Sequence, residues 1–133
     1  MNVASLLSAG ATRAPSCVAW TFGERSATYL QLADRVAALA AGMHRIGVQP
    51  GDRVVLLLPN CPELVEALLA AMWGGFVAVP LNWHLHPHEV AYVVRHCDAT
   101  AIVVADETDG VVAAFDTDLQ VLHVQGRAGL GYE

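Results

Sequence analysis

Apolar residues follow two kinds of spacing along the chain, and each kind predicts a different element. Over residues 32–46 they recur every three or four positions and stop at Gly47, which predicts an amphipathic helix. Thr28 and Gln31 precede this stretch with the spacing of a capping box, in which each side chain bonds the other's backbone amide. Residues 54–58 form an unbroken apolar run, typical of a strand covered on both faces.

The same spacings place the remaining elements. A first helix is expected before Pro15, a later one opens at Asn60 with Glu63, another begins at Pro87, and a weak one covers residues 109–114. Strands are expected at residues 18–22, 26–28, 76–79, 101–104 and 120–124. The first two form a hairpin. The alternation that follows favours right-handed crossovers, so the predicted fold class is α/β: a mainly parallel sheet flanked by helices on both faces, after an N-terminal helix and β-hairpin.

One stretch joins a helix to a strand through a glycine pair. Residues 67–82 read A-L-L-A-A-M-W-G-G-F-V-A-V-P-L-N. Glycine at positions 74 and 75 allows the helix to turn tightly onto the strand, and Pro80 ends strand pairing. The buried face of this helix is expected to consist of Leu64, Leu68, Ala71 and Met72.

Size and charge exclude several functions. With 133 residues, the chain is expected to form a single α/β segment over residues 1–133. Its net charge of −6 argues against nucleic acid, which needs clustered cations. All seven basic residues are arginine, which excludes a Walker-type or Schiff-base lysine. Hydrophobic residues make up 55% of the chain, which suggests surfaces that other protein covers.

The cysteines and the longest apolar stretches indicate the cellular compartment in which the chain is expected. Cys17, Cys61 and Cys97 form no C-x-x-C pair and are expected to be small buried residues in a reducing, cytoplasmic environment. The N-terminus lacks the pattern of a signal peptide. Residues 67–81 are the longest stretch without a polar or charged side chain, and they fall short of the roughly 20 residues that a membrane span needs.

Three histidines form the most metal-like cluster. His84, His86 and His88 alternate along the chain, and alternate residues share a face only in an extended segment. Because Pro87 is expected to begin a helix, the three rings should point apart, and Glu89 should serve the helix N-terminus instead. Loop histidines are therefore the favoured interpretation, and a metal site is the alternative.

Two further patterns suggest ligands more weakly. Residues 126–131 have the order G-x-x-G-x-G, the reverse of the dinucleotide fingerprint, so a frayed terminus is favoured over a phosphate loop. Asp106, Glu107 and Asp109 follow a predicted strand, where a doubly wound sheet binds ligands. A solvated loop is the favoured interpretation there. No serine lies in a G-x-S-x-G elbow.

Several short motifs resemble those of the adenylate-forming enzymes, which include acyl-CoA synthetases. Residues 27–32 resemble the T-Y-x-E-L that opens their first long helix, and residues 47–54 resemble G-V-x-x-G-D-R-V. Residues 59–63 resemble P-N-x-x-E, and residues 67–82 resemble A-x-x-x-G-x-x-x-V-P-L-N. Residues 82–89 resemble the N-W-R-L-x-P-x-E of fatty-acyl-CoA synthetases, with His84 in place of Arg and His86 in place of Ser or Thr.

This resemblance implies the N-terminal part of the large AMP-binding domain of an ATP-dependent acyl-CoA synthetase. The complete enzyme would use ATP, Mg²⁺ and CoA to convert a fatty acid to acyl-CoA, AMP and pyrophosphate. The family's phosphate loop T-S-G-T-T-G-x-P-K and its C-terminal lysine have no counterpart in this sequence. No catalytic, cofactor-binding or metal residue can therefore be assigned.

The first interpretation is thus an inactive scaffold segment, produced by a truncated gene or as an excised piece. The alternative is a stand-alone, non-catalytic interaction module with the same fold. Either should expose apolar surface, so the expected partner is a second copy of the chain or the remainder of the enzyme. The homo-oligomer is expected to form through residues 120–124 or the helices beside them.

Overall fold

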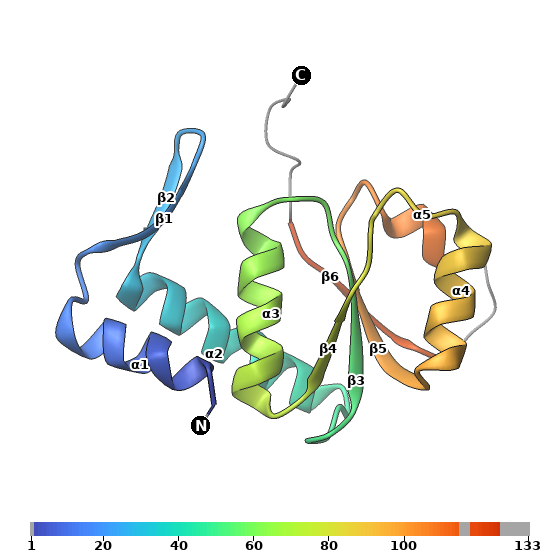
Figure 1. The fold of residues 1–133 in the computed structure, drawn as a ribbon, viewed down its shortest axis with the longest axis horizontal. Helices are drawn as coiled ribbons and strands as arrows, with labels where there is room; N and C mark the ends of the chain where they lie inside the picture. The colour runs from blue at the N-terminus through green and yellow to red at the C-terminus, as the bar shows by residue number, and fades with distance from the viewer. Residues whose placement is uncertain (1, 115–117, 126–133) are drawn as a thin grey trace.

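A computed structural model describes residues 2–114 and 118–125 of the chain (Figure 1). Helices and strands alternate after an N-terminal helix and a hairpin. The elements are α1 (Ala4–Arg13), β1 (Val18–Phe22), β2 (Arg25–Thr28), α2 (Tyr29–Arg45), β3 (Arg53–Leu57), α3 (Pro62–Gly74), β4 (Val77–Pro80), α4 (Pro87–His96), β5 (Ala99–Val104), α5 (Asp109–Val112) and β6 (Gln120–His123). This order confirms the predicted sequence of elements.

The strands form two separate sheets. β1 and β2 pair antiparallel as a hairpin, which projects from the helical body in Figure 1. The other four strands pair parallel in the order β4-β3-β5-β6. In the central strand, Val55 lies opposite Val79 on one side and Ile102 on the other. The predicted parallel α/β fold is confirmed.

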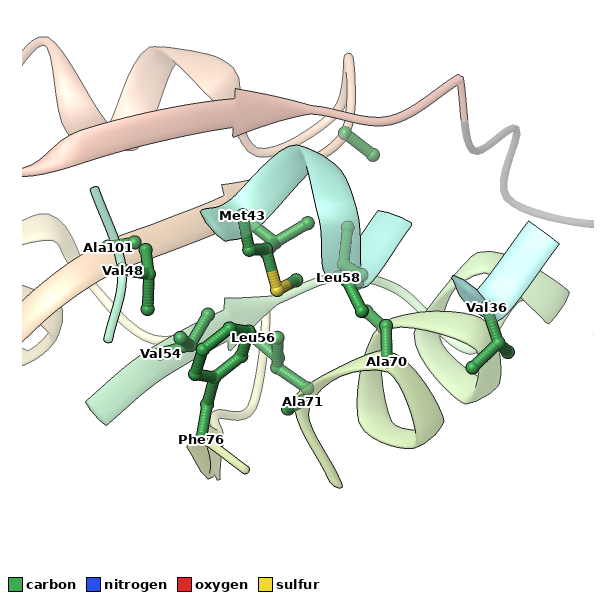
Figure 2. Packing of buried hydrophobic residues seen from close by; sticks show 14 of the residues in the cluster. Val36, Met43, Val48, Val54, Leu56, Leu58, Ala70, Ala71, Phe76 and Ala101 are labelled. Atoms are coloured by element: carbon green, nitrogen blue, oxygen red, sulfur yellow. The ribbon is translucent and has the colours of Figure 1, made fainter. Parts of the chain in front are cut away.

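Helices cover both faces of the parallel sheet, as Figure 1 shows for α3 and α4. Successive side chains of a strand point to opposite faces, so β3 contributes to two clusters. Val54 and Leu56 join the core under α2 and α3, whose centre Figure 2 shows. Val55 and Leu57 join the core under α4. All four are fully buried, which explains why this strand is apolar throughout.

Short-range capping signals act as the sequence predicts. The Gln31 amide donates to Thr28 Oγ1 at 3.2 Å, and the Thr28 amide donates to Gln31 Oε1 at 2.9 Å. The His86 amide donates to Glu89 Oε2 at 2.8 Å, so Glu89 does serve the α4 N-terminus. Both interactions satisfy backbone amides that a helix start leaves unpaired.

The start of α3 differs from the prediction. The helix begins at Pro62, after an N-cap at Cys61, so Asn60 does not open it. Glu63 is therefore the second helical residue, not the third that a capping box uses, and its carboxylate binds Arg25. A second difference concerns Arg25 itself. The predicted strand begins at residue 26, whereas β2 begins at Arg25.

The four strands of the parallel sheet are displaced slightly from their predicted bounds. β3 covers residues 53–57 rather than 54–58, and β4 covers residues 77–80 rather than 76–79, so that Pro80 ends the strand from within it. β5 begins at Ala99 rather than at residue 101, and β6 ends at His123 rather than at residue 124. Phe76 instead turns its ring into the core, where it is 5% exposed and packs edge-on against His44. The displacements leave the sheet parallel, as predicted.

The glycine pair ends α3. Gly75 is the C-cap with a φ of 78°, in the left-handed region that glycine adopts without steric cost. The Phe76 amide donates to the Ala71 carbonyl at 2.8 Å, which closes the last turn. A Cβ atom on Gly74 would lie 2.4 Å from Phe76 Cε2. A side chain is therefore disfavoured at Gly75 by the backbone conformation and at Gly74 by the Phe76 ring.

No helix in the described ranges is long and apolar enough to cross a membrane.

Candidate functional site

Two glutamates lie on the buried face of α3. Glu63 and Glu66 are 2% and 4% exposed, on a helix that has no other charged residue. Of the four residues predicted to form the buried face, only Ala71 is fully buried, and Leu64, Leu68 and Met72 are partly buried, so the prediction was wrong for these three. Ala67 and Ala70 are fully buried and were not predicted. Alanines on this side allow α2 and α3 to approach closely, and the glutamates mark where polar groups cross the interface.

Arginines from two preceding elements neutralise these carboxylates. Arg35 on α2 binds Glu66 with two parallel hydrogen bonds, Nε to Oε1 at 2.6 Å and Nη2 to Oε2 at 2.8 Å. The hydrogen bonds to Glu66 raise the pKa of Arg35 above its ordinary value, against the opposing effect of burial. Arg25 on β2 binds Glu63 through Nη2 and Oε1, and its guanidinium lies 5.8 Å from the Trp20 ring centroid.

The ion pairs border an open hollow of about 440 Å³ between α2, α3 and the end of β6. Its lining comprises Arg25, Arg35, Ala38, Leu39, Glu63, Glu66, Val124 and Gln125. Both carboxylates already bind a guanidinium, although Glu63 Oε2 has no hydrogen-bond partner among the residues that the structure describes. The arrangement suits holding the hairpin and α2 against α3. It offers no free cation to an anionic substrate.

Cys61, next to this cluster, has a thiol of low reactivity. Burial raises its pKa to about 11, and the Glu63 carboxylate acts in the same direction. A hydrogen bond from the Leu64 backbone amide lowers the pKa; its effect is smaller than that of burial but larger than that of the Glu63 charge. The thiol is therefore protonated at neutral pH and is a poor nucleophile. The expected burial of the cysteines is confirmed for Cys61, wrong for the exposed Cys17, and partly met by the half-buried Cys97.

Arg53, from the G-D-R-V motif, ties the sheet to the end of α4. Its Nε donates to the Cys97 carbonyl at 2.8 Å and its Nη2 to the Asp98 carbonyl at 2.7 Å. These carbonyls follow the last turn of α4, where a cation is favourable because the helix dipole is negative there. The motif arginine thus has a structural role in this chain.

Thr108 fills the crevice between β3 and β5, where the strand order reverses. The side chain is buried, donates to the Leu57 carbonyl at 2.7 Å, and accepts from the Ala105 amide at 3.0 Å. Asp106 and Glu107 beside it are exposed. Asp109 Oδ1 lies 3.5 Å from His123 Nε2. The acidic cluster therefore surrounds a closed crevice rather than an open one.

The sequence predicts that the rings of the three histidines in the 84–88 loop point apart, and the structure agrees with this only in part. The rings of His86 and His88 are nearly parallel, at 10° with centroids 5.8 Å apart, while His84 packs on Trp83 at 3.8 Å. The prediction is correct for His84 and wrong for the other two. Among the described residues, no three or more His, Cys, Asp or Glu side chains are grouped to hold a metal ion.

We expect Zn²⁺ or Ni²⁺ to bind this loop no more tightly than it binds ordinary surface histidines. The lone pairs of an imidazole lie in the ring plane, so parallel rings 5.8 Å apart cannot direct two nitrogens to one ion at about 2.1 Å. Calorimetry on the wild-type chain and on a triple His→Ala variant should give the same weak isotherm. A stoichiometric micromolar complex that the triple variant loses would contradict this expectation.

The glycine-rich pattern at residues 126–131 lies outside the described residues, so it stays a prediction.

Comparison with known proteins agrees with this architecture. The family model of the AMP-binding enzymes matches residues 7–129. The chain is 38% identical over 104 residues to a feruloyl-CoA synthase from an Amycolatopsis species, covering 78% of the chain and 21% of that protein. It is 31% identical over 102 residues to a long-chain-fatty-acid–CoA ligase of Bacillus subtilis, covering 77% and 18%. The chain therefore belongs to the AMP-binding enzyme family and spans about a fifth of the length of these relatives.

Solved structures share the fold. The N-terminal domain of FACL13 from Mycobacterium tuberculosis superposes with a TM-score of 0.85 at 25% identity, over 92% of this chain and 33% of that domain. A benzoate CoA ligase from Burkholderia xenovorans gives a TM-score of 0.86 at 28% identity, over 94% of this chain and 26% of that one. The chain thus has the fold of part of each of these two proteins, and in FACL13 this part belongs to the N-terminal domain.

Proposed function

We propose that residues 1–133 form a single α/β scaffold segment in the large domain of an ATP-dependent acyl-CoA ligase, and that the segment does not activate an acid by itself. The observation that carries this proposal is that four buried or paired polar residues of the segment bind other parts of the same chain. Arg25 and Arg35 bind buried carboxylates, Arg53 caps α4, and Thr108 closes the sheet crevice. Each holds one element against another, and none of them is left to bind a substrate.

The described residues do not fit the nucleotide of the complete enzyme. A triphosphate needs several free amides or cations converging on it, with a metal ion. The three arginines named above are occupied, and the sequence contains no lysine. ATP, Mg²⁺ and CoA therefore belong to the proposed complete enzyme, and no step through them is assigned to this chain.

The isolated chain is expected to show no ATP–pyrophosphate exchange and to form no acyl-CoA, because the sequence contains no lysine and Arg25, Arg35 and Arg53 are already bound within the protein, so none of these three can stabilise the charge on a transferring phosphoryl. The assay should compare the purified chain with a mock purification from the same host, using aliphatic and aromatic acids in parallel. Exchange above the mock level that follows the chain through a further column would overturn the proposed scaffold role.

For the complete enzyme we propose a carboxylic acid substrate and a cytoplasmic location. The 82–89 motif and the match to a long-chain-fatty-acid–CoA ligase favour a fatty acid, whereas the match to a feruloyl-CoA synthase favours an aromatic acid, so the proposal names only the carboxylic acid class. Support for the general class comes from the family match over residues 7–129.

The second candidate is an interaction module without chemistry. One observation favours it: the outward side of α3 is apolar along its whole length. As its partner we propose a second copy of the chain for the isolated protein and the remaining enzyme for a longer one.

A further inference from the structure

The solvent face of α3 lacks charge. The two charged residues of this helix are both buried, and its most exposed side chains are Val65 and Trp73, at 46% and 39% exposure, with Leu69 half-buried between them. These three residues are four positions apart, so they line one side of the helix. A helix that is apolar on every side is ordinarily covered on every side.

A groove extends this face onto the hairpin. It lies between β1 and the N-terminal half of α3, has a volume of about 380 Å³, and includes Val65 in its wall. Its lining consists of Trp20, Thr21, Phe22, Asn60, Cys61, Pro62, Leu64 and Val65. The apolar surface therefore has a partly exposed aromatic ring at one end, Trp73, and a mostly apolar recess at the other.

We propose that this surface binds the same surface of a second copy, with the two α3 helices antiparallel and Leu69 at the twofold axis. Val65 and Trp73 lie equally far from Leu69, about 6 Å along the helix in either direction. An antiparallel pair therefore places each Trp73 beside the partner's groove. A twofold interface requires this self-complementarity: if Trp73 of one copy contacts the groove of the other, the reverse contact must form as well.

The size of the surface also favours a second copy that contacts both the exposed strip of α3 and the groove beside β1. A helix of 13 residues is about 20 Å long and about 10 Å wide, so its exposed strip alone falls short of the roughly 800 Å² per partner that stable interfaces bury. The groove and the hairpin supply further area at the N-terminal end of α3, where the partner's Trp73 would lie. Trp and Met are enriched at interface centres, and this strip carries Trp73 beside the half-buried Met72.

Light scattering behind size exclusion tests the assembly. At micromolar concentration the wild-type chain should have twice the 14.1 kDa mass of one chain, and Trp73→Glu should have the mass of one chain. Tyr92→Glu is the matched control, because Tyr92 is 60% exposed on α4, on the opposite face of the sheet, and should leave the dimer intact. Equal urea midpoints in dilute solution would show that Trp73→Glu remains folded.

A crosslink tests the geometry independently of stability. In a Cys17→Ser background, Leu69→Cys should oxidise to a disulfide-linked dimer, because the position faces its own copy at the axis, whereas Tyr92→Cys should not. A monomeric wild-type chain would overturn the proposal and leave the face to another occupant. A dimer that persists in Trp73→Glu and forms no Leu69→Cys crosslink would overturn it as well. Neither result would affect the proposed scaffold role, which the exchange assay tests separately.

Discussion

Replacing Arg35 with alanine is expected to lower the free energy of unfolding by about 2–3 kcal/mol. The change leaves the Glu66 carboxylate, whose side chain is 6% exposed, without the guanidinium that now holds both of its oxygens. Removing one partner of a buried pair costs about 3–5 kcal/mol, and the half-exposed position of Arg35 reduces this because water can reach the carboxylate. Urea denaturation followed by circular dichroism measures the difference.

Two further variants separate the charge from general damage to α2. Arg45→Ala removes an exposed arginine from the same helix and should change the free energy of unfolding by less than about 0.5 kcal/mol. The double variant Arg35→Met with Glu66→Met removes both charges and should recover most of the lost stability, since apolar residues can replace a buried ion pair. Equal midpoints for Arg35→Ala and Arg45→Ala would show that the pair contributes nothing.

Replacing Gly75 with valine is expected to destabilise the fold by about 1–3 kcal/mol. The sequence suggests crowding at this turn, but the structure gives a different reason. An added Cβ would meet only Pro50, at 3.5 Å, so there is room for it, whereas the φ of 78° is costly for a β-branched residue. The shift of the urea midpoint measures the effect.

Gly75→Asn is the matched control, because asparagine adopts left-handed backbone angles more readily than other residues with a Cβ. It should lose clearly less stability than Gly75→Val. If the two variants unfolded at the same urea concentration, contact with a neighbour rather than backbone conformation would be the cause.

The fold could be predicted because its signals are local. The capping residues Thr28 and Gln31 are three positions apart, and Pro87 with Glu89 marks the start of α4 in the same way. The unbroken apolar run of β3 is likewise visible in a few residues, and it identifies a strand with helices on both sides. Helix and strand ends were less certain, because residues such as Phe76 can extend a strand or turn into the core.

The polar interface between α2, α3 and the hairpin could not be predicted in this way. Its pairs join residues 31 and 38 positions apart, and neither partner shows which of several charged residues it will meet. The signal that was available is the occurrence of Glu63 and Glu66 on an otherwise apolar helix, on the side that also carries the alanines. The stacking of His86 on His88 was missed for a related reason, since ring orientation depends on how the loop enters α4.

The same separations constrain the order in which the chain folds. During synthesis the hairpin and α2 are made before Glu63 and Glu66, so Arg25 and Arg35 have no carboxylate to bind until α3 has been synthesised. The N-terminal layer should therefore dock late, after α3 has formed on β3, since a long loop must close before its contacts stabilise anything. Substitutions at the two ion pairs should then accelerate unfolding more than they slow refolding, as expected for contacts made after the transition state.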